Sequence, residues 1–130
     1  MKKINTMKSE LVKMLTPDFS FNDERGNFTQ IVHDGYKQVN VIFTRKGVVR
    51  GGHFHKINTE LFYVVSGSFD LILKKDGEQK TVHFQKGNMF SIPPFVLHSF
   101  RYTEDTVKVS MYDRGVELPD NTKDIYKAEF

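Results

Sequence analysis

Short runs of residues in which apolar and polar side chains alternate recur along most of this chain. One run places Val39, Val41 and Phe43 at every second position, and residues 69–73 repeat the pattern. A period of two is typical of a β-strand with one buried face, because successive side chains of a strand point to opposite sides. The pattern predicts these short strands: 27–32, 38–45, 52–55, 61–66, 69–74, 80–84, 89–92, 98–102 and 106–112.

The residues between these runs favour tight reversals rather than helices. Asp76 and Gly77 separate two of the runs, and a two-residue hairpin turn needs positive φ at both of its central positions. Gly67 permits a similar reversal. Many short strands without intervening helices are typical of an antiparallel sandwich or barrel. We therefore expect an all-β fold, an antiparallel β-barrel with its polar ligands on inward faces near the mouth.

The beginning of the chain breaks this pattern. Four apolar residues there recur at helical spacing: Ile4, Met7, Leu11 and Met14. Pro17 would end such a helix, because proline cannot donate a backbone hydrogen bond. The interpretation is a short N-terminal helix or an arm over residues 1–20. A length of 130 residues then leaves one domain over 21–130, which is long enough to bury a hydrophobic core.

Composition narrows the classes of function. The chain contains no cysteine, so neither a disulfide nor a thiolate metal site is possible. Its 19 Lys and Arg residues against 16 Asp and Glu give a net charge of +3, and the basic residues are scattered, which does not favour nucleic-acid binding. No apolar stretch reaches membrane-spanning length, and residues 1–5 lack the apolar segment of a signal peptide. We expect a cytoplasmic protein.

Three histidines and one glutamate occupy positions from which strands can bring them together. His53 and His55 are two apart on a predicted strand, so their side chains point the same way. Glu60 follows a polar, turn-like stretch and opens the next apolar run, and His98 follows a pair of prolines that marks the entry to a strand. Imidazole and carboxylate groups suit divalent transition metals. The sequence therefore predicts one divalent metal ion, with Zn, Ni, Mn and Fe all open.

The same residues carry a family resemblance. Residues 47–67 read G-x5-H-x-H-x4-E-x6-G, and residues 87–98 read G-x5-P-x4-H. This pattern resembles the two motifs of the cupin superfamily, small β-barrels that hold one metal with three histidines and a glutamate. Phe95 and Tyr102 stand where the second motif usually has glycine and asparagine. Neither position is a ligand, so these departures concern the shape of the loop more than metal binding.

A narrower resemblance concerns the reaction. Residues 23–30 (DERGNFTQ) and 46–53 (KGVVRGGH) resemble the D-x-R-G-x-F and K-G-x-x-R-G-x-H segments of the nucleotide-sugar cupins. These include the dTDP-4-keto-6-deoxyhexose 3,5-epimerases and 3,4-ketoisomerases and the cupin domain of capsular polysaccharide reductases. Residues 124–130 also resemble the ending of the ketoisomerases. The resemblance implies an isomerase or epimerase of a nucleotide-linked 4-keto-6-deoxy sugar, in deoxysugar or polysaccharide biosynthesis.

The resemblance also implies roles for residues. The protons next to a carbonyl are acidic, so a base that removes one and an acid that returns one suffice for the reaction. His53 matches the base of the epimerases, and Arg50 matches a substrate-binding arginine. Arg25 and Phe28 of the first segment are implied to bind the substrate, with the guanidinium on the diphosphate, often across a dimer interface. The ketoisomerases use two histidines, matching His53 and His55, and no metal.

Two roles for His53 compete. A histidine nitrogen committed to a metal cannot also accept a proton. If all four ligands bind the ion, the ion polarises the C4 carbonyl and proton transfer falls to a tyrosine or to water that the ion activates. The candidate tyrosines are Tyr63, Tyr102 and Tyr112.

Other readings stay open. A metal-dependent cupin dioxygenase can use the same ligands, and a non-catalytic sugar-binding cupin can use the same pocket. We also expect a homodimer, since the first strands, around Phe28 and Ile31, can add to a neighbour's sheet.

Overall fold

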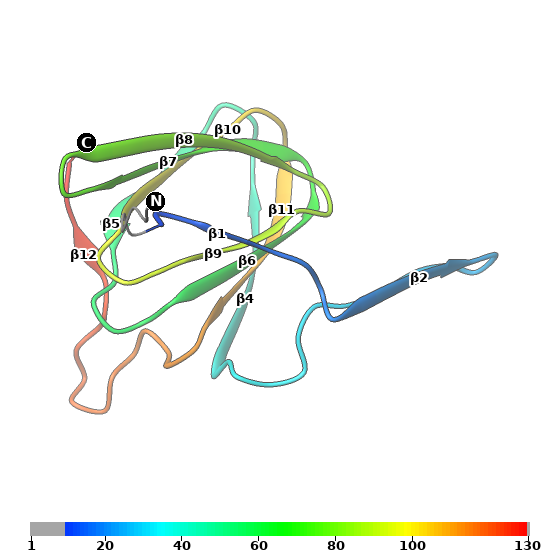
Figure 1. The fold of residues 1–130 in the computed structure, drawn as a ribbon, viewed down its shortest axis with the longest axis horizontal. Helices are drawn as coiled ribbons and strands as arrows, with labels where there is room; N and C mark the ends of the chain where they lie inside the picture. The colour runs from blue at the N-terminus through cyan, green and yellow to red at the C-terminus, as the bar shows by residue number, and fades with distance from the viewer. Residues whose placement is uncertain (1–9, 130) are drawn as a thin grey trace, which may run out of the picture.

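The computed structural model describes residues 10–129, which form two antiparallel five-stranded sheets and a separate hairpin (Figure 1). One sheet has the strand order β1-β9-β6-β11-β4, the other has the order β12-β5-β10-β7-β8, and β2 pairs only with β3. The strands are β1 (Lys13–Leu15), β2 (Phe19–Asp23), β3 (Gly26–Gln30), β4 (Gln38–Thr44), β5 (Val49–Phe54), β6 (Glu60–Ser66), β7 (Ser68–Lys75), β8 (Glu78–Gln85), β9 (Met89–Ile92), β10 (Leu97–Tyr102), β11 (Thr106–Tyr112) and β12 (Tyr126–Lys127).

The all-β, antiparallel prediction is confirmed, but the closed barrel is not seen. Within residues 10–129 the two large sheets share no hydrogen-bonded pair of strands, so each keeps two edges. They lie face to face and enclose the core as a sandwich does. The predicted strands follow the observed ones closely, and pattern reading missed β1, β2 and β12, which are short or exposed.

The helix alternative for the N-terminus is not seen in the described residues. Part of it, 1–9, lies outside them. Residues 10–12 form no helix, and β1 then pairs with β9, with Met14 opposite Phe90. Leu11 and Val12 are both buried although they are neighbours in sequence. In the described part of this segment Leu11 therefore precedes, and Met14 belongs to, a short edge strand and not a helix.

The turn predicted at Asp76 and Gly77 is confirmed. Both residues have positive φ, 51° and 81°, and they join β7 to β8 without an extra residue. This geometry matches the right-handed twist of the two strands, which explains why the longest strand pair of the molecule forms here.

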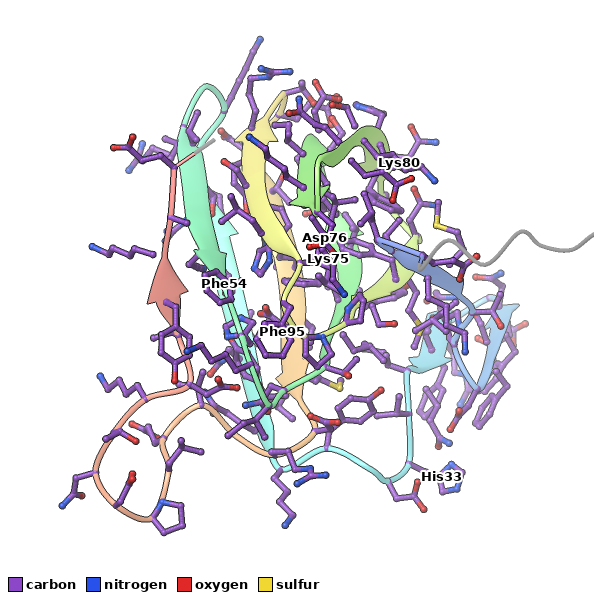
Figure 2. All side chains as sticks on the ribbon, turned by 60° about the vertical axis from the view of Figure 1, so that its left-hand side comes forward. His33, Phe54, Lys75, Asp76, Lys80 and Phe95 are labelled. Carbon is purple, nitrogen blue, oxygen red and sulfur yellow. The ribbon has the colours of Figure 1, made fainter. Side chains whose placement is uncertain are left out.

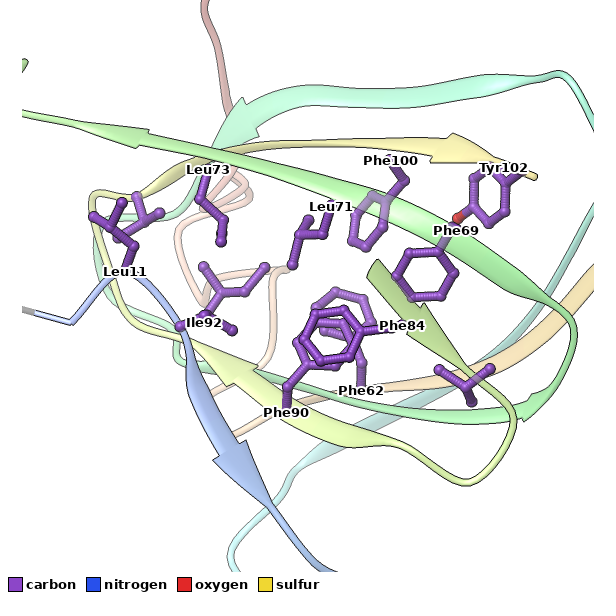
Figure 3. Packing of buried hydrophobic residues seen from close by; sticks show 13 residues of the cluster. Leu11, Phe62, Phe69, Leu71, Leu73, Phe84, Phe90, Ile92, Phe100 and Tyr102 are labelled. Atoms are coloured by element: carbon purple, nitrogen blue, oxygen red, sulfur yellow. The ribbon is translucent and has the colours of Figure 1, made fainter. Parts of the chain in front are cut away.

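Aromatic side chains fill one end of the space between the sheets. Figure 3 shows the rings of Phe62, Phe84 and Phe90 packed together, with Phe69 and Phe100 above them. The Phe84 and Phe90 rings are stacked with centroids 4.0 Å apart. Burying a ring of this size stabilises a fold by about 1.5–3 kcal/mol, so this end supplies much of the stability.

A second apolar cluster covers the outer face of the first sheet. Leu61, Met89 and Met111 are buried there beneath Leu15 and the segment 31–36. The inner face of the same sheet carries the polar residues Glu60, Lys108 and Ser110. The described residues contain no helix that could serve as a membrane span.

Candidate active site

A histidine, a glutamate and a second histidine converge at the polar end of the sandwich. The ligand atoms of His55, Glu60 and His98 all lie within 4.8 Å of one another, and all three residues are buried. The distance from Glu60 Oε1 is 3.1 Å to His55 Nε2 and 3.7 Å to His98 Nε2. Three of the four predicted ligands are thus brought together, and the group could hold a metal ion.

Strand order explains the convergence. Glu60 is the first residue of β6, His98 is the second residue of β10, and His55 directly follows β5. β6 belongs to one sheet, and β5 and β10 belong to the other. Glu60 therefore projects from one wall of the sandwich and the histidines from the opposite wall.

Backbone carbonyls fix both histidine rings. His55 Nδ1 lies 2.6 Å from the carbonyl oxygen of Asp124, and His98 Nδ1 lies 3.0 Å from that of Val96. A carbonyl can only accept, so each Nδ1 carries the proton and, in a neutral ring, the lone pair stays on Nε2, toward Glu60. Metal-ligating histidines are commonly oriented in this way.

The C-terminal segment braces this arrangement. The Asp124 carboxylate accepts backbone hydrogen bonds from Lys56, Ile57 and Asn58, at 2.8 to 3.0 Å. These bonds hold the turn between β5 and β6, and the turn sets the spacing of His55 and Glu60. Pattern reading noted the tail only as a resemblance, and a buried aspartate far along the chain has no local signal.

The buried Glu60 carboxylate dominates the electrostatics of this group. Burial acts to raise the pKa of Glu60, but hydrogen bonds from His55 and Ser110 and the nearby histidines keep that pKa below its usual value. Burial acts to lower the pKa of His55, and the Glu60 carboxylate outweighs it and raises the pKa. Burial lowers the pKa of His98 to about 4, so its ring is neutral. His98 Nε2 is a buried lone pair without a hydrogen-bond partner, as expected of a ligand.

His53 lies beside this group but is not a member of it. Its ring centroid is 5.0 Å from that of His98 and 5.6 Å from that of His55. His53 Nε2 is buried and has no hydrogen-bond partner. Burial, chiefly, lowers the pKa of this ring, so it is neutral at pH 7.

A β-bulge places Arg50 on the same side as His53. Opposite β10, His53 pairs with His98 and Gly51 pairs with Ser99, so Gly52 is left over. A Cβ on Gly51 would lie 2.8 Å from the His98 carbonyl oxygen, which explains the need for glycine. Simple alternation would send Arg50 and His53, three apart, to opposite faces. The bulge brings both to the cavity, where Arg50 Nε donates to Thr44 Oγ1 at 2.8 Å.

Arg50, His53, Glu60 and His98 line one cavity of about 250 Å³. Its walls come from both sheets: Ile42, Arg50, Gly51, His53, Glu60, Phe62, His98, Phe100, Lys108 and Tyr112. Lys108 is the residue that sequence reasoning missed. Its sequence position could have indicated this role: Lys108, Ser110 and Tyr112 alternate along β11, so their side chains share one face of the strand.

The three candidate tyrosines lie in different places. Tyr112 lines the cavity and meets the His55 ring edge-on at 5.2 Å, and burial with the Glu60 charge raises its pKa. Tyr102 packs against Phe69 in the aromatic core, and burial raises its pKa to about 12. Tyr63 lies in the cluster on the outer face of its sheet, away from the cavity.

Arg25 and Phe28 lie on the β2–β3 hairpin, which extends away from the two sheets (Figure 1). The Arg25 side chain is 79% exposed and pairs with Asp23. Phe28 is half exposed and stacks on Phe19 and Phe21, at 5.9 and 5.2 Å between centroids. Within one chain these residues do not reach the cavity.

Phe95, where the cupin motif usually has glycine, has a positive φ, a conformation that glycine adopts more readily than other residues. Its φ is 70°, and its ring stacks on Phe54 at 6.4 Å on the outer side of the second sheet (Figure 2). The departure from the motif therefore places a non-glycine residue in the left-handed region and adds an aromatic contact before β10.

The comparisons with known proteins agree with this fold. The family model described as the polysaccharide biosynthesis C-terminal domain matches residues 21–116. A mutant 3,4-ketoisomerase of Thermoanaerobacterium thermosaccharolyticum, solved with TDP-4-keto-6-deoxyglucose, is 23% identical with a TM-score of 0.76, over 92% of this chain and 89% of that chain. A dTDP-4-dehydrorhamnose 3,5-epimerase from Sulfolobus tokodaii is 22% identical with a TM-score of 0.68, over 94% of this chain and 73% of that one.

Two further matches cover only part of larger proteins. The capsular polysaccharide assembling protein CapF of Staphylococcus aureus is 26% identical with a TM-score of 0.65, over 86% of this chain and 34% of that chain. A 3-hydroxyanthranilate 3,4-dioxygenase of Danio rerio is 32% identical over 72 residues, which are 55% of this chain and 25% of the relative. The predicted resemblance to nucleotide-sugar enzymes is confirmed at the level of fold.

Proposed function

The chain belongs to the polysaccharide biosynthesis C-terminal domain family, and we propose that it is an isomerase or epimerase of a nucleotide-linked 4-keto-6-deoxy sugar. One observation carries the proposal. His53 Nε2 is a buried, unpartnered nitrogen at the wall of a cavity that is also lined by Arg50 and by Glu60 and His98, two members of the His/Glu/His group. The cavity thus offers a base, a cation for an anionic substrate and a site that can polarise a carbonyl.

We assign His53 as the base that removes a proton next to the C4 carbonyl. It lies outside the three-residue ligand group, so its Nε2 is free to accept a proton while that group is engaged. Under this assignment the ligands and the base are different histidines, so the two roles do not compete for His53. Arg50, held by Thr44 at the cavity, would orient the substrate.

We assign one divalent cation to His55, Glu60 and His98, with Zn, Ni, Mn and Fe all open. The fit rests on the two Nε2 atoms facing a buried carboxylate, with both rings held from behind by carbonyls. When bound, such an ion supplies Lewis acidity toward the C4 carbonyl. Tyr112 stays a candidate for proton transfer because it lines the same cavity.

We propose a homodimer in which the hairpin of one chain approaches the cavity of its partner. Arg25 and Phe28 cannot serve the site of their own chain, yet the hairpin carries exposed aromatic rings. The edge strand β4 exposes a matching apolar row: Val39, Val41 and Phe43. Analytical ultracentrifugation tests the proposal, with Val41→Lys expected to give monomers. A cytoplasmic location stays a prediction.

Isotope exchange tests the activity. The protein is incubated in deuterated water with dTDP-4-keto-6-deoxyglucose, and the C3 and C5 protons are followed by NMR. We expect deuterium at one or both carbons, and loss of exchange in His53→Asn. His83→Asn is the matched control, because His83 is exposed on β8. Absence of exchange with this and related 4-keto sugars would overturn the proposal.

The metal assignment has its own arm of this experiment. With His53 as a free base, chelation should slow exchange without removing it, because the base stays in place. If exchange instead stops completely on metal removal and is restored when the ion is added back, proton transfer depends on the ion and its ligands and not on His53 alone.

A dioxygenase is the second candidate, and the 32% identical relative favours it. Oxygen uptake by the iron-loaded protein on 3-hydroxyanthranilate separates the two, since proton exchange needs no oxygen. A third outcome, tight binding of the nucleotide sugar without exchange, would indicate a sugar-binding module.

A further inference from the structure

A lysine is buried inside the sandwich, at the cavity. Lys108 lies on the inner face of β11 and is 2% exposed. Its Nζ lies 3.2 Å from the centroid of the Phe100 ring, and the rings of Phe62, Phe69 and Tyr102 follow at 4.8 to 5.3 Å. An ammonium group in aromatic surroundings gains cation–π attraction but loses its hydration.

Such a placement is unfavourable for stability. Replacing a buried charged group by an apolar side chain of similar volume is often neutral or stabilising. Methionine would fill the same space between Phe62 and Phe100 without the desolvation penalty. A lysine at this position therefore calls for a chemical role, and its cavity is the proposed active site.

The position of Lys108 relative to His53 defines that role. Lys108 projects from β11, in the same sheet as Glu60 on β6. His53 projects from β5, in the facing sheet. Both line the cavity of about 250 Å³, so a sugar ring bound between the sheets would have His53 on one side and Lys108 on the other.

We propose that Lys108 is a catalytic residue that donates a proton to the face of the sugar opposite His53, so that the reaction inverts a carbon next to the C4 carbonyl. This inference rests on the proposed function and deepens it. A keto shift can be completed by one base on one face, whereas inversion needs a proton acceptor on one face and a proton donor on the other.

The proton balance is complete without any redox partner. His53 takes the proton from the carbon, the C–H electron pair becomes the C=C bond of the enolate, and the carbonyl pair moves to oxygen. When the carbonyl reforms, the C=C pair takes a proton from the Lys108 ammonium on the other face. Lys108 is left as a neutral amine, and both groups return to their starting state by exchanging one proton each with water.

The protonation behaviour of Lys108 agrees with this role. Burial lowers its pKa to about 7, the Glu60 charge partly opposes the shift, and Arg50 adds to it. Both the ammonium and the amine are then accessible at neutral pH, as a group that donates and recovers a proton requires.

The test separates exchange from inversion. Wild type, Lys108→Met and the exposed control Lys80→Met are each incubated with dTDP-4-keto-6-deoxyglucose in deuterated water, and NMR follows both deuterium entry and configuration. Lys80 is exposed on β8 (Figure 2) and is not among the residues that line the cavity. We expect Lys108→Met to keep the exchange that His53 performs and to lose inversion by at least about 100-fold. Lys80→Met should match the wild type in both.

Several results would overturn the role of Lys108. They are inversion by Lys108→Met within about threefold of the wild-type rate, loss of exchange together with inversion, or a wild-type product with its carbonyl moved to C3 and no inverted centre. Absence of exchange in the wild type would instead overturn the proposed function, and the role of Lys108 with it. Thermal unfolding confirms that each variant is folded, and Lys108→Gln repeats the test if Lys108→Met does not fold.

Discussion

The two ends of the sandwich interior are equally buried but are built from opposite chemistry. Phe84 within the aromatic end and Lys108, where that end meets the polar one beside the Phe100 ring, are both 2% exposed. Phe84 stacks on Phe90, with its ring fully removed from water. Lys108 borders a cavity that also contains Glu60 and His98.

This difference shows where the molecule gives up stability. Burying an aromatic ring is favourable, whereas burying an ammonium or a carboxylate is costly unless it is paired. The aromatic end holds the sheets together, and the polar end concentrates perturbed pKa values, which is typical of functional sites. Substitutions should therefore act on stability at the first end and on activity at the second.

The largest effect is expected from Phe84→Ala at the aromatic end. Removing a ring that stacks on Phe90 leaves a cavity between the sheets, which should lower the free energy of unfolding by about 3–5 kcal/mol. Urea unfolding at constant pH measures the change. A loss below about 1 kcal/mol would show that the aromatic end is not the source of stability and would break the comparison.

Metal binding should stabilise the polar end. A divalent ion at about 100 times its dissociation constant should raise the free energy of unfolding by about 3 kcal/mol, and chelation should remove the gain. His98→Gln should abolish the response because it deletes a ligand, whereas His83→Gln on the surface should keep it. An equal response in His98→Gln would place the ion elsewhere.

The pH dependence of stability tests the buried charge. The pKa of Lys108 in the native state, about 7, lies below its unfolded value of about 10.4, so between these pH values the unfolded chain binds more protons than the native chain. Stability from this group therefore rises as pH increases from about 7 toward 10.

Lys108→Met should remove that rise and add about 2 kcal/mol of stability at pH 6, where the wild-type lysine is charged. Denaturant unfolding of both proteins at pH 6 and pH 9 measures it. A variant that is less stable than the wild type at pH 6 would assign Lys108 a structural role and would contradict the contrast between the two ends.

The smallest effect is expected from Tyr63→Phe. Tyr63 lies in the outer cluster with Leu61 and Met89, so loss of its hydroxyl should change stability by less than about 0.5 kcal/mol. Deuterium exchange into the sugar should equal that of the wild type. Tyr112→Phe is the matched change inside the cavity, and equal rates for both variants would leave proton transfer to other residues.

Much of the fold could be predicted from local pattern. Residues 69–73 alternate, and the chain turns at Asp76 and Gly77 as expected. The alternation of side chains also identified β11 as a strand, but alternation does not indicate which face of the strand lies inside. There, Val107 and Val109 face outward and Lys108 faces the cavity. On the outer face Val109 packs against the cluster of Leu61, Met89 and Met111, so both faces of β11 contact other side chains and hydrophobicity alone cannot distinguish them.

Part of the site could also be predicted from local sequence spacing. The spacing of His53, His55 and Glu60 is local, and one turn converts it into proximity. That His53 stays outside the ligand group depends on distances between two sheets. The approach of Arg50 depends on a bulge opposite β10, for which the adjacent glycines are only a hint.

Most of the strands, the turn at Asp76 and the candidate residues of the site could be predicted from the sequence, because period, turn chemistry and spacing act over a few residues. The open sheets, the position of His53 outside the group of His55, Glu60 and His98, and the inward-facing Lys108 follow from the tertiary structure alone. These outcomes arise from contacts between strands far apart in the chain, where register and packing, rather than local preference, set which side chains meet.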